Sequence, residues 1–507
     1  MLVNFSGMFL FVPHNDEINY AQYAQLMHRD WENYKYVSMD GSFFGDYKDP
    51  LQYWITSLTV SVTDNPVWGV RLCSVIVGFC GFYFAKKLIA EIWTEEAAVF
   101  FAYLMLFSAY FFYFNAIAIA EVYMYGFGIA FLYFLWRYMV DGRFYHGILS
   151  LLFCLAMTAT KESAKAWFAF AVFIPLLICA KGKTFREFLD TLKSKFMIYF
   201  GKFFLITTLS VLLTPLWIPS KYAAVKAASN YQSQIRTNTE IFAFPFHDWF
   251  GNLKFYFSET LFIDYPWAVL FYFLLVTAGF WFLRKKPLSF LLLVSLWICS
   301  FMAAVIYLKP NFMRHFGMCL YFWYFPVAIS MALVSEKLKF TKYAVVFWAI
   351  LILTGLCQTW NNYSSLLKYG QSDISMTETK AHWANGLGVY QMLDKLKSLE
   401  AGVLIYDPRW GLPGTVVEIY SKTFPQLSIA PLTVDMLGSL HEIKHKINKE
   451  NKNMYILVDR GKHGERPWID AIVTDTTLCS NSDMVQKIYR GKVLDGSSYV
   501  ICKNKHL

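Results

Sequence analysis

Residues 13–25 read PHNDEINYAQYAQ and place two adjacent carboxylates, Asp16 and Glu17, directly after an apolar run. The surrounding chain of 507 residues is mostly apolar: 56% of its residues are hydrophobic, 19% are aromatic and only 16% are charged. Soluble domains average about 25% charged residues. This composition predicts a polytopic membrane protein, so the acid pair stands at the edge of a bilayer.

The basic residues follow a pattern that excludes nucleic acid as the expected partner, although the net charge is +10. Lys and Arg gather in short segments between apolar spans, which is typical of cytoplasmic loops. These segments are KKLIAEIW, RYMVDGR, KGKTFREFLDTLKSK, LRKKP and EKLKFTK. We therefore expect a lipid bilayer as a partner, with these segments on its cytoplasmic side.

The apolar stretches are long enough for membrane helices, because spanning a bilayer takes about 20 mostly apolar residues. Candidate spans lie near 68–85, 97–114, 122–140, 146–160, 166–180, 203–218, 266–283, 288–308, 316–334 and 343–360. Residues 1–12 are apolar but too short to span, and we interpret them as the end of a truncated first helix. About 11 transmembrane helices are then expected. With a cytoplasmic N-terminus, this odd number places the C-terminal region on the extracytoplasmic side.

Two domains are predicted, 1–365 in the membrane and 366–507 outside it. The loop 13–67 is expected to carry interfacial helices, and 219–265 is a long outer loop. In 366–507, short apolar runs such as GVLIYD, MYILVD and SYVICK alternate with helix-like stretches. That alternation favours a soluble α/β domain. Acceptor recognition or a partner interface is the expected role of this domain.

The acid pair has a local structural explanation and a functional one. Asn15 can cap a helix whose first turn holds Asp16 and Glu17, where the helix dipole favours anions. Apolar residues then recur at Tyr20 and Ala24, on a face suited to the membrane interface. The alternative is that the carboxylates carry out chemistry at the membrane surface.

Four further polar features fall on the same predicted outer side. They are Lys48 in GDYKDPLQYW (45–54), Glu121 in NAIAIAEVYMYG (115–126), Lys161 in TATKESAKAW (158–167), and Arg314 with His315 in LKPNFMRHF (308–316). Each alone fits an ordinary ion pair, a wet helix end or a side chain that snorkels to headgroups. Together, three cations would bind an anion at the membrane surface, such as a lipid-borne phosphate. A nearby carboxylate could deprotonate an incoming hydroxyl.

The order of these motifs resembles a known family, the protein O-mannosyltransferase and aminoarabinose-transferase (ArnT-like) family. Its members are GT-C-fold glycosyltransferases that use polyprenyl-phosphate sugars. The resemblance covers roughly residues 1–335. It is carried by Asp16, Glu17, Tyr20 and Ala21, then by Lys48, Pro50, Leu51, Tyr53 and Trp54, then by Glu121, by Thr160 with Lys161, and by Arg314 before Pro326. The chain departs from the family in Asp49, which replaces a proline, in Glu121, where Asp is frequent, and in His315, where Tyr is common.

The resemblance implies the fold and the reaction. The fold would be a polytopic α-helical GT-C membrane domain with a C-terminal extracytoplasmic α/β domain. The enzyme would transfer a sugar, with inversion, from a polyprenyl-phosphate donor to a hydroxyl on a glycolipid, protein or cell-envelope glycan. The expected location is a bacterial inner membrane with an extracytoplasmic active site, and no metal or other cofactor is expected. The alternative is a transporter or flippase of a lipid-linked substrate.

The resemblance also implies roles for individual residues. The two acids, Asp16 and Glu17, would be catalytic, with Asp16 as the general base. The donor phosphate would be bound by Lys48, Lys161 and Arg314. The acceptor or the site itself would be supported by Glu121, Tyr20 and His315.

Overall fold

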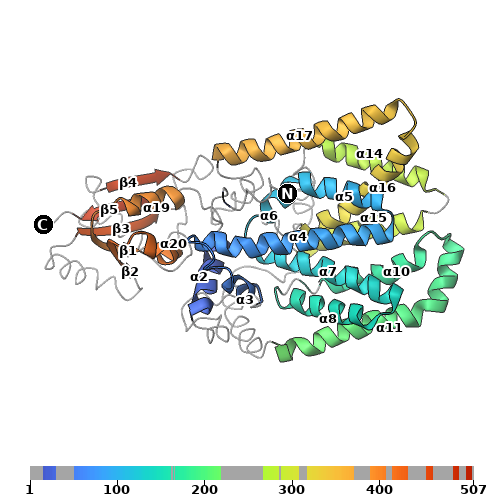
Figure 1. Ribbon diagram of the computed structural model, residues 1–507, viewed down its shortest axis with the longest axis horizontal. Helices are drawn as coiled ribbons and strands as arrows, with labels where there is room; N and C mark the ends of the chain where they lie inside the picture. The colour runs from blue at the N-terminus through green and yellow to red at the C-terminus, as the bar shows by residue number, and fades with distance from the viewer. Residues whose placement is uncertain are drawn as a thin grey trace.

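The computed structural model describes residues 9, 15–29, 51–161, 164, 166–217, 266–284, 287–307, 317–369, 389–406, 414–431, 453–460, 484–489 and 498–504. Within these residues the chain forms a helical bundle and a smaller sheet domain (Figure 1). The two lie at opposite ends of the long axis of the molecule, and the C-terminus is at the far end of the sheet domain.

The bundle consists of apolar helices that range from 6 to 33 residues in length. They are α4 (Pro66–Ile92), α5 (Glu95–Phe107), α6 (Ala109–Phe114), α7 (Ala120–Asp141), α8 (Phe144–Thr158), α9 (Ala166–Ala171), α10 (Phe173–Ala180), α11 (Phe185–Trp217), α14 (Pro266–Phe282), α15 (Leu288–Tyr307), α16 (Gly317–Leu338) and α17 (Tyr343–Tyr369). Every candidate span predicted between residues 68 and 360 coincides with one of these helices or with a consecutive pair. The expected first span, residues 1–12, lies outside the described residues except for Phe9.

By length and composition, several of these helices could cross a membrane. In the described part of the chain, four helices are long and apolar enough to cross a membrane, namely Pro66–Ile92, Phe185–Leu213, Cys319–Leu338 and Tyr343–Trp360. Four shorter apolar helices accompany them, namely Phe144–Thr158, Trp167–Ala180, Val269–Phe282 and Leu288–Met302. The multi-pass membrane architecture predicted from the sequence is confirmed.

Helices α4 and α7 pack closely against each other within the bundle. Gly81 on α4 faces Gly126 on α7, and a Cβ added to Gly81 would lie 2.7 Å from the Gly126 Cα. A Cβ on Gly126 would in turn lie 2.7 Å from the Val77 side chain. Small residues of this kind let helix backbones come close together in a membrane, where packing rather than water exclusion drives association.

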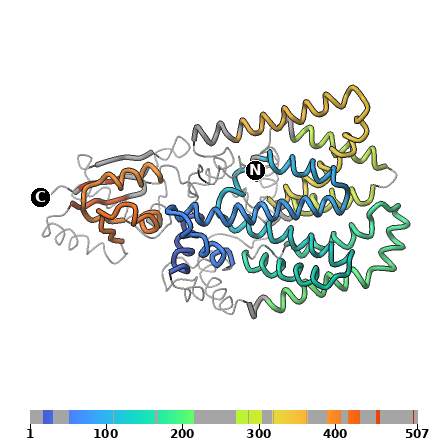
Figure 2. Tube along the Cα trace, in the orientation of Figure 1, coloured from blue at the N-terminus to red at the C-terminus, as the bar shows by residue number. Residues whose placement is uncertain are grey.

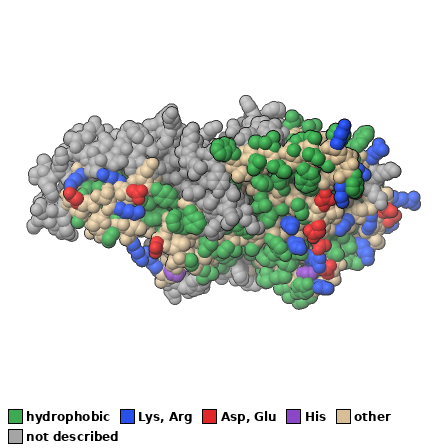
Figure 3. All heavy atoms as spheres, turned by 45° about the horizontal axis from the view of Figure 1, so that its top comes forward, with side chains coloured by type: hydrophobic (Ala, Val, Ile, Leu, Met, Phe, Trp, Pro, Cys, Tyr) green, Lys and Arg blue, Asp and Glu red, His purple; other side chains and the backbone are tan. Residues whose placement is uncertain are grey.

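Basic side chains of the bundle gather at the end that faces away from the sheet domain (Figure 3). The described Lys and Arg residues of the segments predicted to be cytoplasmic include Lys86, Lys87, Arg143, Lys183, Arg186, Lys193, Lys339 and Lys342. At the opposite end, next to the sheet domain, lie α2 (Asn15–Arg29) and α3 (Leu51–Ser57), as the N-terminal blue trace in Figure 2 shows. Among the described residues, the basic side chains of the bundle are thus concentrated at the end away from α2 and α3.

Helices α2 and α3 are held by aromatic contacts and bury most of their apolar side chains. The rings of Tyr20 and Tyr23 on α2 meet the ring of Tyr53 on α3 edge to face, with centroids 5.5 and 5.3 Å apart. Ala24 and Met27 are also buried. Helix α2 packs against protein on several sides, namely α3, α4 and, from the sheet domain, α20 (Gly414–Tyr420).

The sheet domain contains a mixed five-stranded sheet of order β2-β1-β3-β5-β4. Its strands are β1 (Gly402–Tyr406), β2 (Leu427–Pro431), β3 (Asn453–Arg460), β4 (Met484–Tyr489) and β5 (Ser498–Asn504), with the helix α19 (Val389–Lys397) and the 3-10 turn η5 (Ser421–Thr423) beside α20. Strand β1 pairs in parallel with β2 and β3, whereas β5 runs antiparallel to β3 and β4. Three strands coincide with the apolar runs GVLIYD, MYILVD and SYVICK, and the predicted α/β fold is confirmed.

The contact between α4 and α7 gives the first testable prediction. Gly126→Ala should lower the free energy of unfolding by about 1–3 kcal/mol, because the added methyl group would overpack the contact with Val77. Gly201→Ala on α11 is the matched control, since a Cβ there meets no atom within 4 Å. It should be neutral or stabilise by up to about 1 kcal/mol. Thermal unfolding in detergent measures both, and equal midpoints would contradict the packing argument.

Candidate functional site

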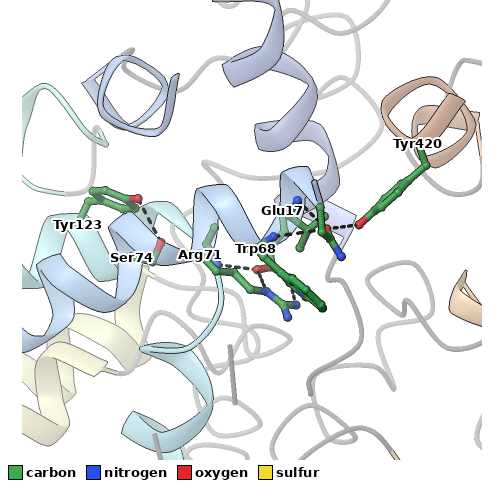
Figure 4. A network of polar contacts seen from close by, with 9 residues as sticks. Glu17, Trp68, Arg71, Ser74, Tyr123 and Tyr420 are labelled. Atoms are coloured by element: carbon green, nitrogen blue, oxygen red, sulfur yellow. Dashed lines mark hydrogen bonds and ion pairs between the residues drawn. The ribbon is translucent and has the colours of Figure 1, made fainter. Parts of the chain in front are cut away.

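A buried ion pair fixes the start of α2 to the bundle. Arg71 donates from Nε to Glu17 Oε1 and from Nη2 to Glu17 Oε2, each at 2.7 Å. Both side chains are 0% exposed. Figure 4 shows the two groups face to face between α2 and α4. Such a two-point pair of a guanidinium and a carboxylate is both strong and orientationally specific.

The same carboxylate also holds the chain that enters α7. The backbone amide of Ala118 donates to Glu17 Oε1 at 2.7 Å. Three hydrogen bonds therefore converge on Glu17 from two elements outside its own helix. Because a buried carboxylate is unfavourable unless it is paired and hydrogen-bonded, this arrangement fixes the position of α2 and of its neighbour Asp16.

A second ion pair lies at the first turn of α7. Glu121, in the first turn of α7, accepts a hydrogen bond from Lys161 Nζ, which follows α8. The Glu121 side chain is 2% exposed and that of Lys161 17%. Only two residues separate Ala118 from Glu121, so one short segment contacts both ion pairs. The Lys161–Glu121 pair and the Arg71–Glu17 pair therefore lie at the same end of the bundle.

Helix α3 joins this cluster through its backbone. The amide of Leu51 donates to the carbonyl of Ala159 at 3.1 Å, two residues before Lys161. The next residues of α3 contact α2 through Tyr53, as described above. The start of α3 therefore lies between the helix that carries the acid pair and the turn that carries Lys161.

The sheet domain contacts this end of the bundle through α20. Tyr420 Oη donates to Asn65 Oδ1 at 2.5 Å, and that oxygen also caps α4 by accepting from the Val67 amide at 3.0 Å. Gln22 on α2 donates to Glu418 on α20, which also accepts from Tyr406 Oη at 2.9 Å. Polar contacts thus connect the sheet domain to both α2 and α4.

Burial changes the acid–base behaviour of this contact. The pKa of the Glu418 carboxyl is raised above its ordinary value, chiefly by burial, while the hydrogen bonds from Tyr406 and Gln22 lower it in part. Burial also raises the pKa of Tyr420, whose hydroxyl donates to Asn65.

The structure places four of the predicted site residues at one end of the bundle. They are Glu17, Tyr20, Glu121 and Lys161. Asp16 belongs to α2, but its side chain lies outside the described residues, as do Lys48, Arg314 and His315. Cys479 and Cys502 both fall in the sequence of the predicted extracytoplasmic domain, where a disulfide between them could form, and their side chains also lie outside the described residues. The roles predicted for all these residues stay predictions.

Sequence reasoning missed Arg71. The span predicted at 68–85 contains it, and an ionisable residue inside an apolar span is itself a signal, because such residues almost always have a partner or a function. Asn65 was missed as well, although an asparagine before Pro66 fits the cap of a helix that begins with proline. Among the described residues, no group of three or more His, Cys, Asp or Glu side chains is arranged to hold a metal ion.

Comparisons with known proteins identify what this architecture is similar to. Residues 48–192 match the dolichyl-phosphate-mannose-protein mannosyltransferase family. None of the curated protein sequences matches the chain. Among solved structures, ArnT from Cupriavidus metallidurans in the apo state superimposes with a TM-score of 0.56 at 12% identity, over 100% of this chain and 96% of that one.

Two further structures share the fold. ArnT from Cupriavidus metallidurans bound to undecaprenyl phosphate gives a TM-score of 0.53 at 12% identity, over 99% of this chain and 96% of that one. The Archaeoglobus fulgidus oligosaccharyltransferase in complex with Zn and sulfate gives 0.50 at 12% identity, over 94% of this chain and 68% of that one. The resemblance to GT-C glycosyltransferases predicted from the sequence is confirmed.

The Glu17–Arg71 pair gives the second prediction. Glu17→Gln should lower the free energy of unfolding by about 3–5 kcal/mol, because it removes the carboxylate charge that pairs with the buried Arg71 guanidinium. Replacing both residues by methionine should recover most of the loss, since no charge then stays buried. Thermal unfolding in detergent measures the three proteins. A single variant as stable as the wild type would contradict the inference that the pair holds α2 in place.

The contact between the sheet domain and α4 gives the third prediction. Tyr420→Phe removes the hydrogen bond to Asn65 and should lower the free energy of unfolding by about 0.5–1.5 kcal/mol. Tyr343→Phe, on an exposed side chain of α17, is the matched control and should have no effect. Denaturant or thermal unfolding in detergent gives both values. Equal effects of the two substitutions would show that the contact adds nothing to stability.

Proposed function

We propose that this protein is an integral-membrane glycosyltransferase that transfers a sugar from a polyprenyl-phosphate donor to a hydroxyl acceptor. The observation that carries the proposal is the fold shared over nearly the whole chain with an ArnT that binds undecaprenyl phosphate. The match of residues 48–192 to a mannosyltransferase family supports it, because that stretch contains Lys48, Glu121 and Lys161. The relatives named as transferases give the transporter alternative no support.

The proposed reaction requires a carboxylate that accepts the proton of the acceptor hydroxyl. Asp16 accepts the proton of the acceptor hydroxyl as that oxygen attacks the anomeric carbon of the donor sugar. The bond between that carbon and the phosphate oxygen breaks on the opposite face, which inverts the configuration. The polyprenyl phosphate leaves with the electron pair. Glu17 contributes by holding α2, since its two oxygens are occupied by Arg71 and by the Ala118 amide.

The departing phosphate needs positive charge. Lys161 lies at the end of the bundle beside the sheet domain. Its side chain is paired with Glu121 and is mostly shielded from solvent. Lys48 and Arg314 are the further cations that we assign to the phosphate. Fixed cations in a site of low dielectric stabilise developing charge strongly, because they need no reorganisation as the bond breaks. A phosphate that leaves with its charge neutralised by these groups requires no protein general acid.

The sidedness follows from the distribution of charge. Basic segments mark the cytoplasmic ends of membrane helices. In this protein they gather at the end away from the sheet domain (Figure 3). We therefore place Glu17, Lys161 and the sheet domain on the extracytoplasmic side. A bacterial inner membrane is the proposed location, with a glycolipid, a protein or a cell-envelope glycan as the acceptor.

Substitution of site residues gives the fourth prediction. Asp16→Asn should nearly abolish sugar transfer, and Lys161→Ala should reduce it by about 100- to 1,000-fold, since one stabilising contact to the developing charge is lost. Lys181→Ala is the matched control, because Lys181 Nζ contacts the Glu91 carbonyl at the opposite end of the bundle. Turnover of a polyprenyl-phosphate sugar by purified protein measures all three.

The same assay tests the assignments and the proposed absence of a metal requirement. Protein yield and a cooperative melting transition confirm that each variant is folded. Near-normal turnover by Asp16→Asn would remove Asp16 from the role of base. We expect full activity in EDTA, and activity that is lost in EDTA and restored by magnesium or manganese would contradict metal independence.

A further inference from the structure

A buried glutamine at this end of the bundle has no hydrogen-bond partner for its side-chain amide among the described residues. Gln52 is the second residue of α3 and is 1% exposed. Among the described residues, neither its Nε2 nor its Oε1 has a hydrogen-bond partner. A buried polar group left unsatisfied costs about 1–3 kcal/mol, so native structures retain few of them.

The threonine and serine hydroxyl groups of α3 are satisfied within the helix. Thr56 Oγ1 donates to the Gln52 carbonyl at 2.9 Å, and Ser57 Oγ donates to the Trp54 carbonyl at 2.8 Å. The Gln52 amide therefore differs from these two hydroxyl groups on its own helix, which are both hydrogen-bonded. A leucine or methionine would fill the same position without that cost.

The place of Gln52 in the fold points to the site. The preceding residue, Leu51, donates its amide to Ala159, two residues before Lys161. The following residue, Tyr53, packs against Tyr20 on the helix that carries the acid pair. Gln52 therefore lies on the element between the proposed phosphate-binding lysine and the proposed base.

We propose that the Gln52 amide binds the sugar of the lipid-linked donor through the hydroxyl groups of that sugar. This inference rests on the proposed function. The amide presents two N–H donors and one oxygen acceptor, so a ligand that satisfies it must both accept and donate. Sugar hydroxyl groups do both. An ionised phosphate only accepts and would leave Oε1 unpaired, and a polyprenyl chain does neither.

Such a residue acts on specificity as well as on affinity. A site built to hydrogen-bond a substrate hydroxyl rejects an analogue that lacks it, because the buried polar group is then left unpaired. Gln52 thus recognises the sugar, whereas Lys161 and the other cations bind the phosphate. Sugar recognition and phosphate binding can be measured separately. The lipid-linked donor carries both the sugar and the phosphate, whereas the bare polyprenyl phosphate carries only the phosphate.

The experiment compares binding of three ligands to purified protein in detergent. They are undecaprenyl phosphate, undecaprenyl phosphate mannose and undecaprenyl phosphate aminoarabinose. The wild type should bind at least one sugar-loaded lipid more tightly than the bare phosphate. Gln52→Met, which keeps the length of the side chain, should bind bare undecaprenyl phosphate as the wild type does. It should bind the preferred sugar-loaded lipid at least about tenfold more weakly, the loss of one hydrogen bond to a buried group.

Two other variants make the result interpretable. Gln52→Asn shortens the side chain and should show the same selective loss, which keeps the test valid if the methionine variant is poorly folded. Ser150→Ala is the matched control, because Ser150 on α8 is also fully buried with an Oγ that lacks a partner among the described residues. It should change neither affinity. The melting temperature of Gln52→Met should equal or exceed that of the wild type, because an unsatisfied buried group is removed.

Different failures have different meanings. If Gln52→Met keeps the wild-type preference for the sugar-loaded lipid, or loses both ligands equally, the assignment of Gln52 to the sugar is overturned while the proposed function stands. A wild type that binds the bare carrier but prefers neither sugar-loaded lipid overturns the assignment as well. If the wild type binds none of the three lipids, the proposed function fails and the inference fails with it.

Discussion

A fully buried ion pair between Glu17 and Arg71 is the constraint on which the arrangement of this site depends. Taking two charges out of water is unfavourable unless each is paired and its remaining hydrogen-bonding capacity is used. Here the carboxylate accepts two bonds from Arg71 and one from the Ala118 amide. Helix α2 can therefore occupy only the position in which its first turn meets both α4 and the entry to α7. The adjacent Asp16 takes its place in the fold from this contact.

Two further contacts depend on the same position of α2. The segment that donates from Ala118 leads directly to Glu121 and so to Lys161, which connects the acid pair to the cation of the site. On its other side, α2 receives α20 of the sheet domain through Gln22 and Glu418. The sheet domain therefore contacts both α2 and Asn65, the residue that caps α4.

The sequence predicted the fold well because apolar length and the placement of Lys and Arg are local properties of a membrane chain. The spans between 68 and 360 and the strands within GVLIYD, MYILVD and SYVICK needed no knowledge of distant contacts. Arg71 is different, since it stands 54 residues from Glu17 and lies inside a span that composition marks as apolar. Gln52 carries no sequence signal, because only three-dimensional burial distinguishes it from an ordinary glutamine at the surface.

The central claim is that one end of the bundle, beside the sheet domain, binds a lipid-borne phosphate. The most direct measurement is an experimental structure of the protein with undecaprenyl phosphate. We predict density for the phosphate within hydrogen-bonding distance of Lys161 Nζ, with Lys48 and Arg314 around it and Asp16 facing the same space. Phosphate density at the basic end of the bundle, or Asp16, Lys48, Lys161 and Arg314 spread around the periphery without a shared cavity, would contradict it.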